Sequence, residues 1–505
     1  MYMVEGVYDV NKQRNIAIMM ILIFACALQY FSNAGTLYSP GSYNFQRILA
    51  GKQVIDPDFN LLKYDNIYAK NAQNAINSKS VNPMYLSASF IGVYDNSMMR
   101  CILLVMSVMS IIILFHKLFS SYGAGIFAAI VFLSNSTFLI VESYIFYFYM
   151  SLFLLISFIE NRNVLSLALI FPLLLASYFT HTSSFFAIFV ILIGTCMSYL
   201  VLNVFNRSTD KKHLLMTAAI ISLIALVSSF IVSQTSGYFI NDFTKNFPKA
   251  IERAVFYVSS YEMGTYFYLY IIEKIILIPL AFVFVCARLK ELYLNKPDIK
   301  DKFVLSFFFS FIPLSVLFGF TNVLARTFDY MLPLLGALTF YELRRCKLSI
   351  RMRDTVIVSL ITLFILLSVF HFDIPPRSME KYDDATISGL QFAVQSDNVF
   401  TDTFLANVFL SHLDYYTVDG LDYSEMNKVN SVYYGQDENM VYDAFRDKNI
   451  NEFIISKHTL TRGLDILNAP HFLHPVSSVS KYDSMRFLDR VYSNEMIWIW
   501  EFNEM

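Results

Sequence analysis

Residues 100–116, RCILLVMSVMSIIILFH, hold no charged side chain between Arg100 and His116. A second apolar run, YGAGIFAAIVFLSNST, occupies residues 122–137, after a gap of five residues. A helix needs roughly 20 apolar residues to cross a hydrocarbon core about 30 Å thick. Both runs approach this length, so the stretch predicts two consecutive membrane-spanning helices.

The same pattern continues over the first 371 residues. We predict eleven transmembrane helices, at residues 15–32, 100–116, 122–137, 138–159, 164–180, 183–204, 214–234, 265–286, 303–319, 328–343 and 355–371. The composition agrees, because 56% of the residues are hydrophobic and 15% are charged, against about 25% charged in soluble domains. The predicted fold class is a polytopic α-helical membrane protein, and no concentrated basic face points to a nucleic-acid partner.

The chain changes character after residue 371. The last 134 residues hold 10 basic and 21 acidic side chains, whereas the residues before them hold 28 and 19. Strand-like runs, helical stretches and a closing hairpin are predicted here, at Asn398–Phe400, Tyr415–Val418, Glu452–Ser456, Thr403–Leu413, Glu438–Lys448, Arg486–Val491 and Met496–Phe502. We predict a transmembrane domain at 1–371 and a soluble α/β domain at 372–505, with the tail carboxylate Asp402 on a solvated surface.

The basic residues of the short loops predict the orientation. Seventeen Lys and Arg fall on one side of the membrane and four on the other, and the richer side is the cytoplasmic one. The N-terminus is then cytoplasmic and the C-terminal domain extracytoplasmic, in a multi-pass protein of the cell membrane. The segment at about 33–99 becomes a long first outer loop.

This arrangement resembles the GT-C superfamily of membrane glycosyltransferases, in particular prokaryotic proteins of the protein mannosyltransferase and aminoarabinose transferase type. The stretches that carry the likeness are PMYL at 83–86, SYFTHT at 177–182, RTFDYMLPL at 326–334, VFTD at 399–402 and VYSNEMIWIW at 491–500. The resemblance implies transfer of a sugar from a polyprenyl-phosphate donor, held among membrane lipid, to an acceptor at the outer face. The sequence does not identify that acceptor.

Such a reaction needs a general base for the acceptor. GT-C members usually place an Asp just after the first span, but residues 35–43 contain no acid. The nearest acids are Asp56 and Asp58, and Glu142 lies where GT-C proteins often bear an active-site acid. We predict these three as catalytic, the alternatives being a solvated turn for the two aspartates and a structural hydrogen bond for the glutamate. These acids could bind a divalent metal ion, but their spacing does not specify one.

A positive group must also hold the departing phosphate. Arg326 is a lone arginine in a short outer loop, and a guanidinium binds phosphate bidentately. Its alternative partner is Asp329, three residues further along the same helical face. Lys274 within a span and His181 at the end of another are further donor-phosphate candidates, with interhelical pairing and a satisfied interfacial histidine as their alternatives.

Three other functions remain to be compared with the transferase. A catalytically silent GT-C-like protein would keep the fold without the usual acid. A polymerase or ligase of lipid-linked glycans would not need the folded tail. A transporter commonly shows internal repeats, and none relates residues 1–200 to residues 201–371.

Overall fold

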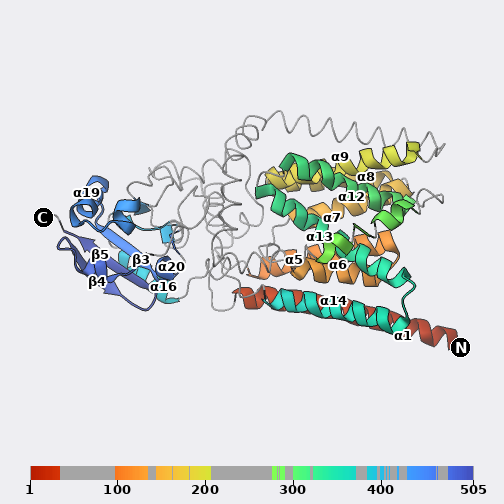
Figure 1. Ribbon diagram of the computed structural model, residues 1–505, viewed down its shortest axis with the longest axis horizontal. Helices are drawn as coiled ribbons and strands as arrows, with labels where there is room; N and C mark the ends of the chain where they lie inside the picture. The colour runs from red at the N-terminus through yellow and green to blue at the C-terminus, as the bar shows by residue number, and fades with distance from the viewer. Residues whose placement is uncertain are drawn as a thin grey trace. The chain divides into compact units, whose positions relative to one another are not determined.

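We describe a computed structural model of the chain. It describes residues 2–33, 97–134, 144–161, 163–180, 182–205, 276–280, 282–283, 285–290, 299–318, 322–370, 384–394, 398–402, 405–406, 409, 418–419, 429–461, 463–464 and 476–503. The helices up to residue 370 form one compact unit, and the described residues from 384 on belong to a second (Figure 1). The predicted domain boundary between residues 371 and 372 lies outside the described residues.

The first unit consists of helices. They are α1 (Tyr2–Asn33), α5 (Ser97–Phe119), α6 (Tyr122–Ser134), α7 (Tyr144–Asn161), α8 (Val164–Thr180), α9 (Thr182–Phe205), α12 (Ile299–Phe318), α13 (Asn322–Arg345) and α14 (Ile350–Phe370). Residues 276–280, 282–283 and 285–290 are helical as well. Pro172 in α8 and Pro333 in α13 lie inside helices, which is common in membrane spans because neighbouring groups satisfy the freed carbonyls.

The apolar runs and the helices coincide. Each predicted span in the described part of the chain overlaps a helix, whereas 214–234 lies outside it and 265–286 is described only from residue 276. Within the described residues, two helical stretches are long and apolar enough to cross a membrane, Cys101–Phe119 and Ile350–Val369. Most helices begin or end a few residues beyond the apolar run, because polar side chains at the ends belong to the helix too.

Helix α6 is largely enclosed by its neighbours. Ten of its 13 residues are buried, and it packs against α13 and α14. Gly125 lets α6 approach α5, since a Cβ at that position would meet the carbonyl oxygen of Ile112 at 2.6 Å. Gly336 lets α13 approach α6, since a Cβ at that position would meet the side chain of Val131 at 2.9 Å. These close contacts fix how the central helices fit together.

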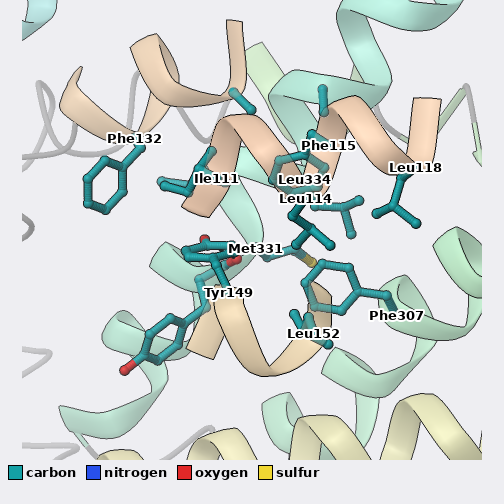
Figure 2. Close-up of a cluster of buried hydrophobic side chains, with 14 of the residues drawn as sticks. Ile111, Leu114, Phe115, Leu118, Phe132, Tyr149, Leu152, Phe307, Met331 and Leu334 are labelled. Carbon is teal, nitrogen blue, oxygen red and sulfur yellow. The ribbon is translucent and has the colours of Figure 1, made fainter. Parts of the chain in front are cut away.

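A cluster of large side chains connects α5, α6, α7, α12 and α13 (Figure 2). Phe115, Tyr149 and Phe307 are buried within it, at 0% exposure. Phe148 lies beside Tyr330 and Phe307, with ring centroids 4.8 and 6.1 Å apart. Aromatic pairs at these distances contribute stability beyond that of the area they bury, so the cluster holds these helices in one arrangement.

The second unit is built on a five-stranded sheet with the order β2-β1-β3-β5-β4. The strands are β1 (Val399–Phe400), β2 (Val418–Asp419), β3 (Glu452–Ser456), β4 (Leu488–Ser493) and β5 (Ile497–Phe502). Strands β2, β1 and β3 are parallel, whereas β5 runs antiparallel to β3 and β4. Strands thus form at the predicted Asn398–Phe400 and Glu452–Ser456 and in the closing hairpin. Of the predicted strand Tyr415–Val418 the structure describes only Val418, where β2 begins, and of the predicted helix Thr403–Leu413 it describes residues 405, 406 and 409, which are helical.

Helices cover this sheet. They include α16 (Asp384–Ala393), the π-helix η5 (Asn430–Tyr434), α19 (Glu438–Lys448), α20 (Lys457–Thr461) and α21 (Ser480–Asp483). The core cluster on one face contains Phe453, Trp500 and Tyr482, each fully buried. On the other face Gly389 of α16 lies against Ile497, which a Cβ would meet at 3.2 Å. The sheet is thus covered on both faces, as an α/β domain requires.

Candidate functional site

The predicted site residues fall largely outside the described part of the chain. Those outside it are Asp56, Asp58, Glu142, His181 and Lys274. Arg326 is the fifth residue of α13. Its side chain and that of Asp329 lie outside the described set. The roles of the predicted site residues in catalysis and phosphate binding stay predictions.

Charged side chains gather at one end of the helical unit. Near the end of α7, Glu160 Oε2 lies 2.7 Å from Lys117 Nζ of α5, and Glu160 Oε1 lies 4.0 Å from Lys300 Nζ. Lys300, at the start of α12, also donates a hydrogen bond to Ser120 Oγ between α5 and α6, at 3.1 Å. The ends of α5 and α7 therefore meet the starts of α6 and α12.

A buried arginine adds α13 to this end. The side chain of Arg288 is 5% exposed and its Nε donates to Glu342 Oε1 near the end of α13. Its Nη1 lies 3.3 Å from Asp301 Oδ1 of α12, and its guanidinium lies 5.0 Å from the ring centre of Tyr341. Burying a charge is costly unless it is paired and hydrogen-bonded, and two carboxylates meet that requirement here.

The charged end defines the opposite end of the unit. Helices α7 and α13 end in the charged cluster, so both start at the opposite end of the unit. Helix α12 starts in the cluster and therefore ends at that opposite end. Helix α8 begins three residues after α7 ends, so its own end also lies opposite the cluster. In the chain, Glu142 precedes α7 by two residues, His181 directly follows α8, and Arg326 belongs to the beginning of α13. Three of the predicted site residues are thus close in sequence to helix ends that share one side of the unit.

A buried hydrogen bond anchors α13 near that side. Tyr149 Oη of α7 donates to the backbone carbonyl of Tyr330 at 2.9 Å, and Figure 2 shows Tyr149 within the cluster that also holds Met331. Tyr330 follows Arg326 by four residues, which is about one turn of an α-helix. The tyrosine therefore ties α7 to the turn of α13 next to the one that bears Arg326.

In the second unit, polar side chains collect at the carboxyl edge of the parallel strands. Thr401 and Asp402 directly follow β1, whereas Ser456 ends β3 and Thr459 lies three residues beyond it. The chain leaves β1 for β2 on one side and returns to β3 on the other. Ligands of open α/β sheets bind outside the carboxyl ends of the strands at such a switch point.

Asp402 organises this edge. It is 1% exposed, and its Oδ1 accepts a hydrogen bond from the Leu405 N–H at 3.0 Å. Its Oδ2 accepts from Thr459 Oγ1 at 3.0 Å, and Thr459 Oγ1 lies 2.9 Å from Ser456 Oγ. The prediction that Asp402 lies on a solvated surface is wrong, because this carboxylate joins the ends of two strands inside the domain.

The titratable groups of the second unit with altered pKa values include a carboxylate and an amine. Burial, together with Glu501 on the neighbouring strand, raises the pKa of Glu452 to about 7. Burial lowers the pKa of Lys481 to about 8, and its Nζ donates to the carbonyls of Tyr433 and Gly435 at 2.5 and 3.3 Å. Glu452 begins β3, at the edge opposite Asp402, and Lys481 caps η5, so neither belongs to the Asp402 cluster.

Sequence reasoning missed both polar clusters. Arg288 is buried, although its position suggested a cytoplasmic loop, and its partner Glu342 is 54 residues away. Thr459 is 57 residues from Asp402. The only local signal was the VFTD stretch, which carries the Asp at the end of a strand. Among the described residues, no group of three His, Cys, Asp or Glu side chains is placed to hold a metal ion, and the metal prediction on Asp56, Asp58 or Glu142 concerns residues outside them.

Two solved structures share this architecture. A crystal structure of the Archaeoglobus fulgidus oligosaccharyltransferase in complex with Zn and sulfate has a TM-score of 0.52 at 10% identity, over 86% of this chain and 67% of that one. The crystal structure of the A. fulgidus oligosaccharyltransferase tethered with an acceptor peptide containing the NVT sequon has a TM-score of 0.50 at 10% identity, over 87% and 69%. No family model and no curated protein matches the sequence.

At this identity the likeness concerns the fold. Oligosaccharyltransferases are GT-C proteins, so the comparison supports the predicted GT-C fold of a helical membrane protein. It does not extend to the mannosyltransferase or aminoarabinose transferase type.

Proposed function

We propose that this chain is a GT-C-type glycosyltransferase that takes its sugar from a polyprenyl-phosphate-linked donor at the membrane. The observation that carries the proposal is the fold shared with an oligosaccharyltransferase over 86% of the chain. That protein is named for the transfer of oligosaccharide, and it has been captured with an acceptor peptide. The charge of the short loops favours the extracytoplasmic face for this reaction.

The donor phosphate would bind where α13 begins. Arg326 precedes Arg344, near the far end of the same helix, by 18 residues, which corresponds to about 27 Å. This distance is close to the thickness of a hydrocarbon core, about 30 Å, so the two arginines suit opposite membrane faces. The hydrogen bond from Tyr149 to the Tyr330 carbonyl restrains the helix close to Arg326, which favours a fixed position for the guanidinium.

The chemistry requires one bond to form while another breaks. The acceptor nucleophile attacks the anomeric carbon, and the bond from that carbon to the phosphate oxygen breaks with its electron pair on the leaving polyprenyl phosphate. The acceptor proton moves to a carboxylate, for which Asp56, Asp58 and Glu142 are the candidates. Arg326, Lys274 and His181 would stabilise the negative charge of the leaving phosphate. A divalent cation held by the same acids would supply further charge neutralisation.

Donor binding tests the phosphate assignment. Undecaprenyl phosphate is titrated against the purified full chain in nanodiscs, and bound lipid is measured by native mass spectrometry. Hydrogen bonds to charged groups contribute about 1.5–3 kcal/mol, so Arg326→Ala should weaken binding roughly 10- to 150-fold. Arg446→Ala is the matched control, because Arg446 is an exposed arginine in the second unit, paired with Asp443 at 3.1 Å. Equal affinity of wild type and Arg326→Ala would refute the assignment.

A catalytically silent GT-C-like protein is the second candidate, and the lack of any acid at residues 35–43 favours it. Turnover separates the two functions. With a polyprenyl-phosphate-linked sugar as donor, an enzyme releases polyprenyl phosphate, and Glu142→Gln or the Asp56→Asn/Asp58→Asn pair slows the release. A silent protein binds the lipid, and its wild type and variants release none.

A further inference from the structure

The loop between α13 and α14, together with the helix ends that flank it, forms a strongly basic patch. Residues 344–354 contain five basic side chains and one acid. Four of the five are exposed, namely Arg344, Arg345, Lys347 and Arg351, and the guanidinium groups of Arg344 and Arg345 lie over the rings of Phe340 and Tyr341. Arg353 lies 3.2 Å from the one acid, Asp354. Among the described residues, no carboxylate forms an ion pair with Arg344, Lys347 or Arg351. The patch therefore carries positive charge that the protein leaves available.

Apolar side chains alternate with these charges. Leu348, Ile350 and Met352 are 37%, 70% and 56% exposed. Exposure of such large apolar side chains to water is unfavourable. Ser349 fixes the local backbone, since its Oγ accepts from the Met352 N–H at 3.3 Å and its carbonyl from the Arg353 N–H at 3.0 Å. A surface that interleaves basic and large apolar side chains matches a lipid interface, where headgroups meet acyl chains.

Helix α14 gives lipid access to the patch. Only 22% of the apolar window of α14 is buried, against 56% for α5, so most of its surface is free to contact lipid. Figure 1 shows α14 along the edge of the helical unit. Two basic residues, Arg351 and Arg353, also lie in the first turns of α14, where the helix dipole disfavours positive charge. Bound anions would offset that cost.

We propose that residues 344–353 form a binding site for anionic phospholipid headgroups, in which Arg344, Lys347 and Arg351 contact phosphate and Leu348, Ile350 and Met352 enter the upper acyl layer. Clusters of four or more basic residues at a membrane boundary attract acidic lipids in this way. The site lies at the end of α13 opposite Arg326, and it does not depend on the donor chemistry. It would fix the depth and tilt of α13 and α14 in the bilayer.

The test measures lipid selectivity of the full chain. Nanodiscs containing equal amounts of phosphatidylcholine and phosphatidylglycerol are loaded with protein, and the lipids retained on the ejected protein are counted by native mass spectrometry. Each basic residue near the surface changes affinity about fivefold. The variant Arg344→Gln/Lys347→Gln/Arg351→Gln should therefore lower the ratio of retained phosphatidylglycerol to phosphatidylcholine at least tenfold. Raising the salt concentration from about 0.1 to 1 M shortens the Debye length from about 10 to 3 Å and should lower the wild-type ratio.

The matched control removes three exposed basic residues from the second unit, as Arg446→Gln/Lys457→Gln/Arg486→Gln, and should keep the wild-type ratio. If the triple loop variant does not fold, Lys347→Gln alone should give about a fivefold decrease. The proposal is overturned by a wild type without preference for phosphatidylglycerol, by an unchanged ratio in the loop variants, or by an equal decrease in the control. A protein partner at this loop, in place of lipid, would give the first of these results.

Discussion

Replacing Asp402 by alanine should loosen the carboxyl edge of the sheet in the second unit. The variant removes the acceptor for the Leu405 N–H, at 3.0 Å, and the acceptor for the Thr459 hydroxyl, at 3.0 Å. Both donors belong to buried residues, with exposures of 0% and 1%. Losing a side chain that caps backbone N–H groups costs about 0.5–2 kcal/mol. The Thr459 hydroxyl can turn toward Ser456 Oγ, 2.9 Å away, so its loss is limited to about 1 kcal/mol.

The total of about 1.5–3 kcal/mol is measurable by hydrogen–deuterium exchange of the full chain in detergent. Since about 1.4 kcal/mol corresponds to a tenfold change, the amides of β1 and β3 should exchange roughly 10 to 140 times faster. Peptides of α13 serve as the internal reference, because they belong to the other unit. Asp443→Ala, which removes an exposed carboxylate paired with Arg446, should change exchange by no more than about twofold. If Asp402→Ala leaves β1 and β3 within twofold of wild type, the structural role assigned to this carboxylate is wrong.

Three further predictions follow from contacts in the two units. Burial keeps Glu452 neutral up to a pKa of about 7, against an ordinary value of 4.5, so the folded state binds more protons than the unfolded state and loses stability as the pH rises from about 4.5 through 7. Glu452→Gln should match wild type at pH 4 and, because the group is partly exposed, gain on the order of 1 kcal/mol at pH 8. Equal melting curves at both pH values would contradict this. Arg288→Met should destabilise the helical unit by about 3–5 kcal/mol by leaving Glu342 unpaired, and adding Glu342→Met should recover part of the loss in thermal unfolding; a double variant as unstable as the sum of the singles would exclude the coupling. Tyr149→Phe should cost about 1 kcal/mol and weaken undecaprenyl phosphate binding, whereas a variant with wild-type affinity would show that this hydrogen bond does not position the start of α13.

Local sequence patterns predicted most of the elements. Apolar runs located the helices because burial in a bilayer demands long, uncharged stretches, and strand-like runs such as Glu452–Ser456 located the sheet. The first and last residues of the elements were predicted less accurately than their presence. Helix α1 begins at Tyr2, 13 residues before the predicted span, because its first turns are polar and hydropathy does not distinguish a polar helix from a loop.

The long-range contacts could not be predicted from the sequence. Asp402 is buried because Thr459 completes its hydrogen bonds from 57 residues away, and Arg288 is buried because Glu342 neutralises it across 54 residues. The sequence around a carboxylate or guanidinium does not show whether the group faces water or is buried with hydrogen-bonding partners. The candidate catalytic residues were inferred from the acid and base chemistry that a transferase needs, and Asp56, Asp58 and Glu142 remain predictions of that reasoning.

The most direct test of the proposed transferase is a density map of the full chain in nanodiscs with undecaprenyl phosphate. The account predicts an elongated lipid whose phosphate lies within hydrogen-bonding distance of Arg326 at the start of α13, with Glu142 or an acid of the first outer loop facing it. A closed, lipid-free surface at the start of α13, with those acids turned toward bulk solvent, would contradict it.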